Sequence, residues 1–192
     1  MRSAREGVEA LVSALRAHEG TLAELARDPG ELDGDGDGAP GPAQVAAAGP
    51  RAARAPREYE LLLEMILEGT CLHYGPPRAV RTDDPDLALL LGDQLYALGL
   101  ERLAALGDLK AVAELADAIS LLAQAQAAGD AELAGAVWEA GVVAVGWGGG
   151  EELDEAKQLA RAGDSRALAA LRAARDAWII VDGTLPDAFN AR

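Results

Sequence analysis

Three glutamates near the middle of the chain have the residue type and spacing that could hold a metal ion. Glu60, Glu64 and Glu68 are four residues apart, so in a helix their carboxylates follow one face. A di-iron bundle would also need Glu-x-x-His pairs, but Cys71 stands three residues after Glu68 and His73 stands five after it. The spacing therefore favours a solvent-exposed acidic stripe, and we expect no metal-binding or catalytic carboxylates here.

An earlier acidic segment matches the opening of an EF-hand calcium loop. Asp33, Asp35, Asp37 and Gly38 occupy the expected positions. The twelfth position, which should supply a bidentate glutamate, is Gln44, and two prolines fall inside the loop. An acidic linker is therefore favoured over a calcium site.

Two further motifs have both a chemical and a structural interpretation. The aspartates Asp83, Asp84 and Asp86 could hold magnesium, but acidic residues around a proline are typical of the first turn of a helix. The glycine-rich segment 146–150 could approach a phosphate. Its spacing matches no phosphate-binding loop, and acidic residues follow it directly, so a hinge before a helix is favoured.

The remaining titratable side chains have ordinary structural interpretations. Cys71 is the only cysteine, which excludes an internal disulfide, and its apolar surroundings predict a small core residue. His18 is expected on the polar side of a helix, in contact with solvent. His73 lies at a predicted helix end, where an imidazolium would favour the negative end of the helix dipole.

Composition and charge limit the classes of partner. The formal net charge is −15, which argues against nucleic acid and against an anionic membrane surface. No apolar run reaches the ~18 residues needed to span a membrane. The N-terminal segment has glutamates where a signal peptide would be apolar, so we expect a cytoplasmic protein.

The periodicity of the apolar residues divides the chain into four parts. Residues 1–28 form an amphipathic helix with a Ser3/Glu6 capping box, which is predicted to be tethered by a flexible linker over residues 29–56 rich in Gly, Pro, Asp and Ala. Residues 57–182 form a helical bundle, and residues 183–192 form a tail. The fold class is therefore predicted to be all-α.

Three junctions in the bundle repeat one device, at Gly107-Asp108, Gly129-Asp130 and Gly163-Asp164. The glycine can leave one helix in the left-handed conformation and the aspartate can cap the next, so successive helices should be antiparallel. The segment that begins at residue 57 carries a broad apolar surface and is predicted to be central. Gly92 interrupts an apolar helix, which predicts close packing of another helix at that point.

Residues 59–128 resemble the middle helices of a trans-isoprenyl diphosphate synthase. In that family a helix ends in a His, and a later helix contains a Leu-Ala-Gly-Asp element. Leu72-His73 resembles the first feature, Leu91-Gly92-Asp93-Gln94-Leu95 the second, and the segment 103–108 its exit. The resemblance implies an isoprenoid-synthase-like bundle.

The chain departs from that family where the chemistry is carried out. The three aspartates that the family places after the His fall on Tyr74, Gly75 and Arg78, and the second aspartate-rich motif has no counterpart. Without these magnesium ligands, prenyl transfer is not expected. The residues that the resemblance leaves as contacts for a ligand or partner are His73, Arg78, Arg81 and Asp93.

These features predict a non-catalytic helical protein that acts through protein–protein interaction. Some family members work with a small subunit that lacks the aspartate motifs, so the partner could be a prenyltransferase. Alternatively, the chain could associate with a second copy of itself. No cofactor is expected. Two alternatives stay open: a helical-repeat scaffold of the HEAT type, and a protein that binds an apolar, isoprenoid-type ligand in the bundle interior.

Overall fold

The computed structural model describes residues 1–32 and 38–180, and over these residues it contains helices and no strand. The helices are α1 (Ala4–Arg16), α2 (Thr21–Leu25), α3 (Pro42–Ala47), α4 (Pro56–Tyr74), α5 (Pro85–Ala105), α6 (Leu109–Ala127), α7 (Ala131–Trp147), α8 (Glu151–Arg161) and α9 (Ala167–Ile180), with a 3₁₀ turn at Pro29–Glu31. The predicted all-α helical bundle is confirmed. None of the described helices is long and apolar enough to cross a membrane.

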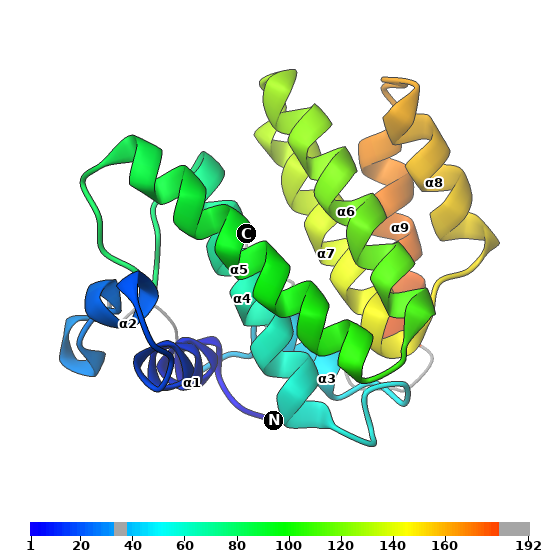
Figure 1. Ribbon diagram of the computed structural model, residues 1–192. Helices are drawn as coiled ribbons and strands as arrows, with labels where there is room; N and C mark the ends of the chain where they lie inside the picture. Colours follow the sequence, from blue (N-terminus) through cyan, green and yellow to red (C-terminus); the bar gives the residue numbers. More distant parts are fainter. Residues whose placement is uncertain (33–37, 181–192) are drawn as a thin grey trace.

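Helix α4 lies at the centre of the molecule, as its apolar surface predicts (Figure 1). Its side chains Leu62, Leu63 and Ile66 belong to a large core shared with α3 and with α5 to α9. Met65 and Leu72 point into a smaller core built with α1, α2 and α5. One helix therefore joins two apolar clusters, with α1 to α5 on one side of Figure 1 and α6 to α9 on the other.

Glycines allow two pairs of helices to approach closely. A Cβ added at Gly92 of α5 would lie 3.1 Å from the Gly69 carbonyl oxygen of α4, which confirms the predicted close packing at that glycine. Between α3 and α7 the approach is closer, because a Cβ at Gly146 would lie 1.9 Å from the Ala46 carbonyl oxygen. The Trp147 indole also donates to the Val45 carbonyl oxygen at 3.0 Å. These contacts hold α3 against the end of α7.

The glycine exits are confirmed at all three Gly-Asp junctions, and the aspartate caps are confirmed at the first two, whereas Asp164 accepts from the Arg166 N–H, before α9 begins. Gly107, Gly129 and Gly163 have φ angles of 74°, 74° and 65°, in the left-handed region that glycine tolerates. Asp108 then accepts a hydrogen bond from the third backbone N–H of α6, and Asp130 does the same for α7. The short turns bring α6 and α7 side by side along their length.

The segment predicted as a flexible linker is largely structured. Residues 42–47 form α3, which is buried along its whole length between α4 and α7. Its alanines are small enough for the close contact with α7, so a composition typical of linkers here serves packing. Helix α1 packs on α3 and α4, so it is part of the folded body and is not a separate helix on a flexible linker as predicted. The aspartates of the EF-hand-like motif, Asp33, Asp35 and Asp37, lie outside the described residues, as does the predicted tail 183–192.

Candidate functional site

The acidic row on α4 is buried and meets partners from three distant parts of the chain. At its N-terminal end, Glu60 accepts hydrogen bonds from the Arg2 guanidinium and from the Gln44 side-chain amide, each at 3.1 Å. The same amide nitrogen of Gln44 donates to Glu64 at 2.9 Å. Gln44 is only 2% exposed, and Gly7 of α1 leaves the space for its amide, since a Cβ there would lie 2.1 Å from Nε2.

The C-terminal half of the row binds the loop that joins α4 to α5. Arg78 places Nη1 2.9 Å from Oε2 of Glu64 and Nε 3.3 Å from Oε2 of Glu68. Glu68 is completely buried, and its carboxylate accepts hydrogen bonds of 2.8–3.1 Å from the backbone N–H groups of Arg78, Ala79 and Val80. Burial alone would lower the pKa of Arg78, but the two carboxylates outweigh it and raise that pKa.

The prediction of a solvent-exposed stripe was therefore wrong. Each of Glu60, Glu64 and Glu68 is hydrogen-bonded to protein groups, as buried charges must be to offset the cost of desolvation. The row fastens α1, α3 and the loop after α4 onto one helix. Within the described residues no group of three or more His, Cys, Asp or Glu side chains is arranged to hold a metal ion.

Two of the four predicted contact residues meet on the α4–α5 surface. The His73 ring places Nε2 3.1 Å from Oδ1 of Asp93 and stacks on Tyr96, with centroids 5.3 Å apart and planes at 7°. The Tyr96 hydroxyl is in turn hydrogen-bonded to Thr70 at 3.1 Å. A Cβ at Gly92 would lie 2.7 Å from the His73 ring, so the absence of a side chain at Gly92 leaves the space that the ring occupies. The imidazole lies in the last turn of α4, as predicted, and its packing across α5 is an additional contact.

The other two predicted contact residues lie elsewhere. Arg78 belongs to the buried acidic row, and Arg81 forms a surface ion pair with Glu31 at 3.4 Å. Cys71 is half-buried, less deep than the predicted core position, and burial raises the pKa of its thiol. His18 is exposed, as predicted. The proposed contact role of the four residues stays a prediction.

A further polar cluster lies where the start of α4 meets the start of α6. The Asp108 carboxylate caps α6 through the Ala111 N–H at 3.0 Å and also accepts hydrogen bonds from Arg51 at 2.6 Å and the Tyr59 hydroxyl at 2.9 Å. Burial alone would raise the pKa of Asp108, but these hydrogen bonds outweigh it and lower the pKa. Burial, assisted by Asp108, raises the pKa of Tyr59 to about 12. The hydrogen bonds of this cluster hold the start of α4 against the start of α6.

The lowered pKa of Asp108 makes its contribution to stability dependent on pH. A carboxyl whose folded pKa lies below its unfolded value of about 3.9 stabilises the fold above that value, and the benefit is lost as pH falls through the folded pKa. Asp108→Asn keeps a capping side chain but loses the charge, so we expect about 1–2 kcal/mol of destabilisation at pH 7. Urea unfolding of both proteins from pH 7 to pH 3 should show the difference shrinking below about pH 4. Asp130→Asn, in a cap without these extra partners, is the control, and a constant difference for Asp108→Asn would contradict the assignment.

A second buried charge joins α8 to α6. Lys157 is 4% exposed and places Nζ 2.5 Å from Glu114 Oε2 and 3.5 Å from Asp117 Oδ2. The ammonium ion balances the carboxylates around it, which is the condition for burying a lysine. This arrangement explains how a polar helix attaches to the bundle.

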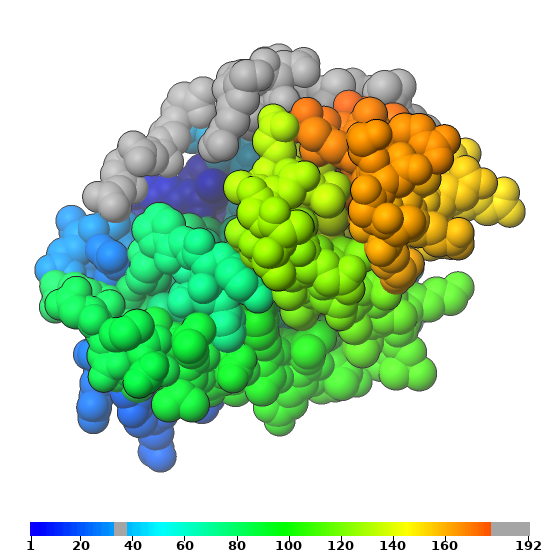
Figure 2. Space-filling view, turned by 90° about the horizontal axis from the view of Figure 1, so that it is seen from above, coloured from blue at the N-terminus to red at the C-terminus, as the bar shows by residue number. Residues whose placement is uncertain are grey.

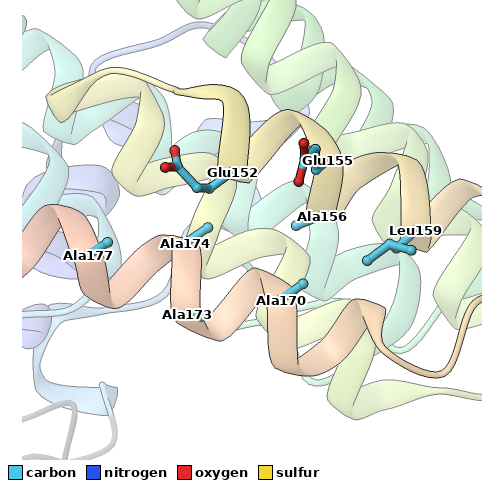
Figure 3. Close-up of a pocket in the computed structure, with 8 residues that line it drawn as sticks. All are labelled: Glu152, Glu155, Ala156, Leu159, Ala170, Ala173, Ala174 and Ala177. Carbon is cyan, nitrogen blue, oxygen red and sulfur yellow. The ribbon is translucent and has the colours of Figure 1, made fainter.

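One surface hollow, with a volume of about 420 Å³, lies between α8 and α9. Figure 3 shows Ala170, Ala174 and Ala177 of α9 pointing toward α8, with the carboxylates of Glu152 and Glu155 above them. The second hollow, of about 290 Å³, lies between α1 and the loop after α4. Both open at the surface, so neither is the interior cavity expected for an apolar ligand.

The outer side of α5 is the most apolar exposed surface among the described helices. Leu90 is 67% exposed and Leu89 is 46% exposed, while Leu109, just beyond the turn into α6, is 75% exposed. Helix α5 packs along α4 and meets α6 only near the turn between them, so this side faces away from the protein (Figure 1). In Figure 2, which is turned by 90°, α5 forms part of the molecule's lower edge. Two large apolar side chains are therefore left uncovered on this side of α5, among the exposed polar residues Asp86, Asp93 and Gln94.

Sequence analysis did not predict which residues bind the buried carboxylates of α4 and Asp108. Gln44 and Arg2 had no local pattern to identify them, because they meet α4 only in the folded chain. The Arg51–Asp108 contact likewise joins residues far apart in sequence. A usable signal did exist in α4: apolar residues flank the glutamates on both sides, so the acidic row had to pass between two buried surfaces.

The resemblance of residues 59–128 to trans-isoprenyl diphosphate synthases rests on sequence elements that include His73 and Asp93. His73 lies in the last turn of α4 and Asp93 lies on α5, and the two side chains are in contact. This contact is local to one helix pair, and the relationship to the family stays a prediction. Comparison of the chain with protein-family models, with curated proteins and with solved structures finds no match.

Proposed function

We propose that this chain is a non-catalytic helical protein that acts by binding another protein through the outer face of α5. The observation that carries the proposal is the exposure of Leu89, Leu90 and Leu109 on and beside a helix with one main neighbour. Exposed apolar surface of this kind, rimmed by polar residues, marks interaction sites in soluble proteins. The rim here is acidic, with Asp86 and Asp93 exposed beside the leucines.

The structural contacts of the glutamates on α4 support a non-catalytic role. Glu64 and Glu68 are taken up by Gln44, Arg78 and backbone N–H groups, so they hold the fold together. The resemblance to isoprenyl diphosphate synthases suggests which separate partner to test first, a full-length prenyltransferase. A second copy of the chain is the other partner that the same surface could accept.

The packing of the bundle favours this proposal over the two alternatives. The large core gathers side chains from seven helices, α3 to α9, around one centre, whereas stacked repeats bury a surface only between neighbours. Gly141 and Gly146 of α7 are filled by close neighbours, since a Cβ at Gly141 would lie 2.7 Å from the Ala118 Cβ and a Cβ at Gly146 would lie 1.9 Å from the Ala46 carbonyl oxygen. An interior apolar ligand therefore has less support than a protein partner.

Leu90→Glu tests the proposal, because a charge at the most exposed leucine of α5 would have to be buried against a partner. We expect recovery of a bound protein on the tagged full-length chain to fall about tenfold or more, which is the size of effect expected at an interface centre. The measurement is quantitative co-purification from the native organism. Mass spectrometry of the bound fraction shows whether a prenyltransferase is present, and an assay of prenyl transfer shows whether it is active.

Gln124→Glu is the matched control, since it adds the same charge at an exposed site on α6, away from α5. Equal recovery with both variants would exclude α5 as the binding face. If the purified chain alone condensed isopentenyl diphosphate with an allylic diphosphate, the non-catalytic role would be excluded as well.

A further inference from the structure

We infer that the outer face of α5 pairs with the same face of a second copy, with the two helices antiparallel around a two-fold axis near Ala97. The inference rests on the proposed function and identifies the partner at that surface. Exposed residues spaced by three and four form one stripe along α5. In order along the helix, the stripe consists of Asp86, Leu90, Gln94, Ala97, Glu101 and Ala105.

This stripe is complementary to itself when reversed. With the axis between positions 97 and 98, Leu90 of one copy faces Ala105 of the other. Gln94 faces Glu101, so an amide N–H can donate to a carboxylate. The small Ala97 lies at the centre, where the helices come closest. Apolar groups thus meet apolar groups, and the polar positions meet suitable partners.

The charges select the antiparallel direction. In that arrangement the exposed Asp86 at the start of α5 comes beside the start of α6 in the other copy, where Lys110 and Leu109 are exposed. In a parallel arrangement Asp86 would face Asp86 and Glu101 would face Glu101, and like charges oppose association. The two-fold axis also makes the contact closed, because each copy gives and receives the same face.

The size of the contact predicts a weak dimer. A helix of 21 residues is about 31 Å long, and one helix pair lies at the small end of specific interfaces. The charge of −15 on each copy adds long-range repulsion. We therefore expect a dissociation constant in the range of roughly 1–100 µM at physiological salt.

Disulfide trapping tests the position of the axis. In a Cys71→Ser background, Ala97→Cys places two thiols next to the axis, within the ~7 Å Cα separation that a disulfide needs. Ala104→Cys is also exposed on α5, but its two copies would be about 20 Å apart. Mild oxidation should join most Ala97→Cys chains into a covalent dimer and leave Ala104→Cys monomeric. Equal cross-linking of the two variants would overturn the inferred arrangement.

Sedimentation of the full-length chain tests the contacts. We expect the wild type and Gln124→Glu to show a concentration-dependent dimer, and Leu90→Glu to weaken it about tenfold or more. Asp86→Lys and Lys110→Glu should each weaken the dimer. The double variant should recover most of the loss, because the swapped charges again face one another. Circular dichroism confirms that each variant is folded.

The outcomes separate this inference from the proposed function. A wild type that stays monomeric at about 100 µM, the weak limit of the expected range, overturns the inference. If Leu90→Glu then still lost a different co-purified protein, the proposed function would stand with another partner. If Leu90→Glu changed neither dimerisation nor co-purification, both would fail.

Discussion

Gly146→Ala is expected to lower the free energy of unfolding by about 3 kcal/mol or more, which is the upper range for overpacking a tight contact. The added Cβ would lie 1.9 Å from the Ala46 carbonyl oxygen, and the nearest atoms are all backbone. No side-chain rotation can relieve such a clash, so α3 would have to move away from α7. That movement would weaken the Trp147 hydrogen bond to Val45 and the packing of the segment that carries Gln44.

Gly135→Ala on the same helix is the matched control. No atom lies within 4 Å of a Cβ added at Gly135, so the change should stabilise the protein by about 0.5–1 kcal/mol through helix propensity. Urea unfolding followed by circular dichroism measures both variants. Similar midpoints for Gly146→Ala and the wild type would show that α3 does not lie against α7 as described.

Arg78→Met should have the next largest effect, a loss of about 2–4 kcal/mol. Removing one partner of a buried ion pair leaves an uncompensated charge, which typically costs 3–5 kcal/mol. We expect somewhat less because the Arg78 side chain is 29% exposed, so water can reach Glu64 and Glu68 after the substitution. The measurement is again the free energy of unfolding in urea at pH 7.

Two further variants show whether the loss comes from the stranded carboxylates. Arg81→Met removes a surface pair with Glu31 and should change stability by less than about 0.5 kcal/mol. Glu64→Gln in the Arg78→Met background removes the unpaired charge while the amide can still accept from Gln44, so part of the loss should return. If the losses in unfolding free energy of Arg78→Met and Glu64→Gln simply added in the double variant, Arg78 and Glu64 would not be a coupled pair.

Local patterns were enough to predict much of the architecture. The central position of α4 followed from its broad apolar surface, and the Gly-Asp junctions followed from the conformational needs of a helix exit and a cap. The close approach at Gly92 followed from the cost of glycine in a helix. In each case the physical cause lies within a few residues of the pattern itself.

The errors came from contacts between distant residues. Alanine, glycine and proline around residues 42–47 have the composition of a linker, and only the facing surface of α7 makes them a buried helix. The glutamates of α4 look solvated until Gln44 and Arg78 are brought to them by the fold. His73 lies in the last turn of α4, as predicted, but its contact with the ring-sized space at Gly92 of α5 could not be read from the local pattern.

The division of contacts around α4 has a consequence for protein synthesis. The smaller apolar cluster and the partners of the acidic row all come from residues 2–98, so they can assemble once α5 has left the ribosome. The other apolar side of α4 and the surface of α3 have to wait for Gly146 and its neighbours to be translated. The carboxylates of α4 can thus gain their hydrogen-bond partners early, while half of its apolar surface is still uncovered.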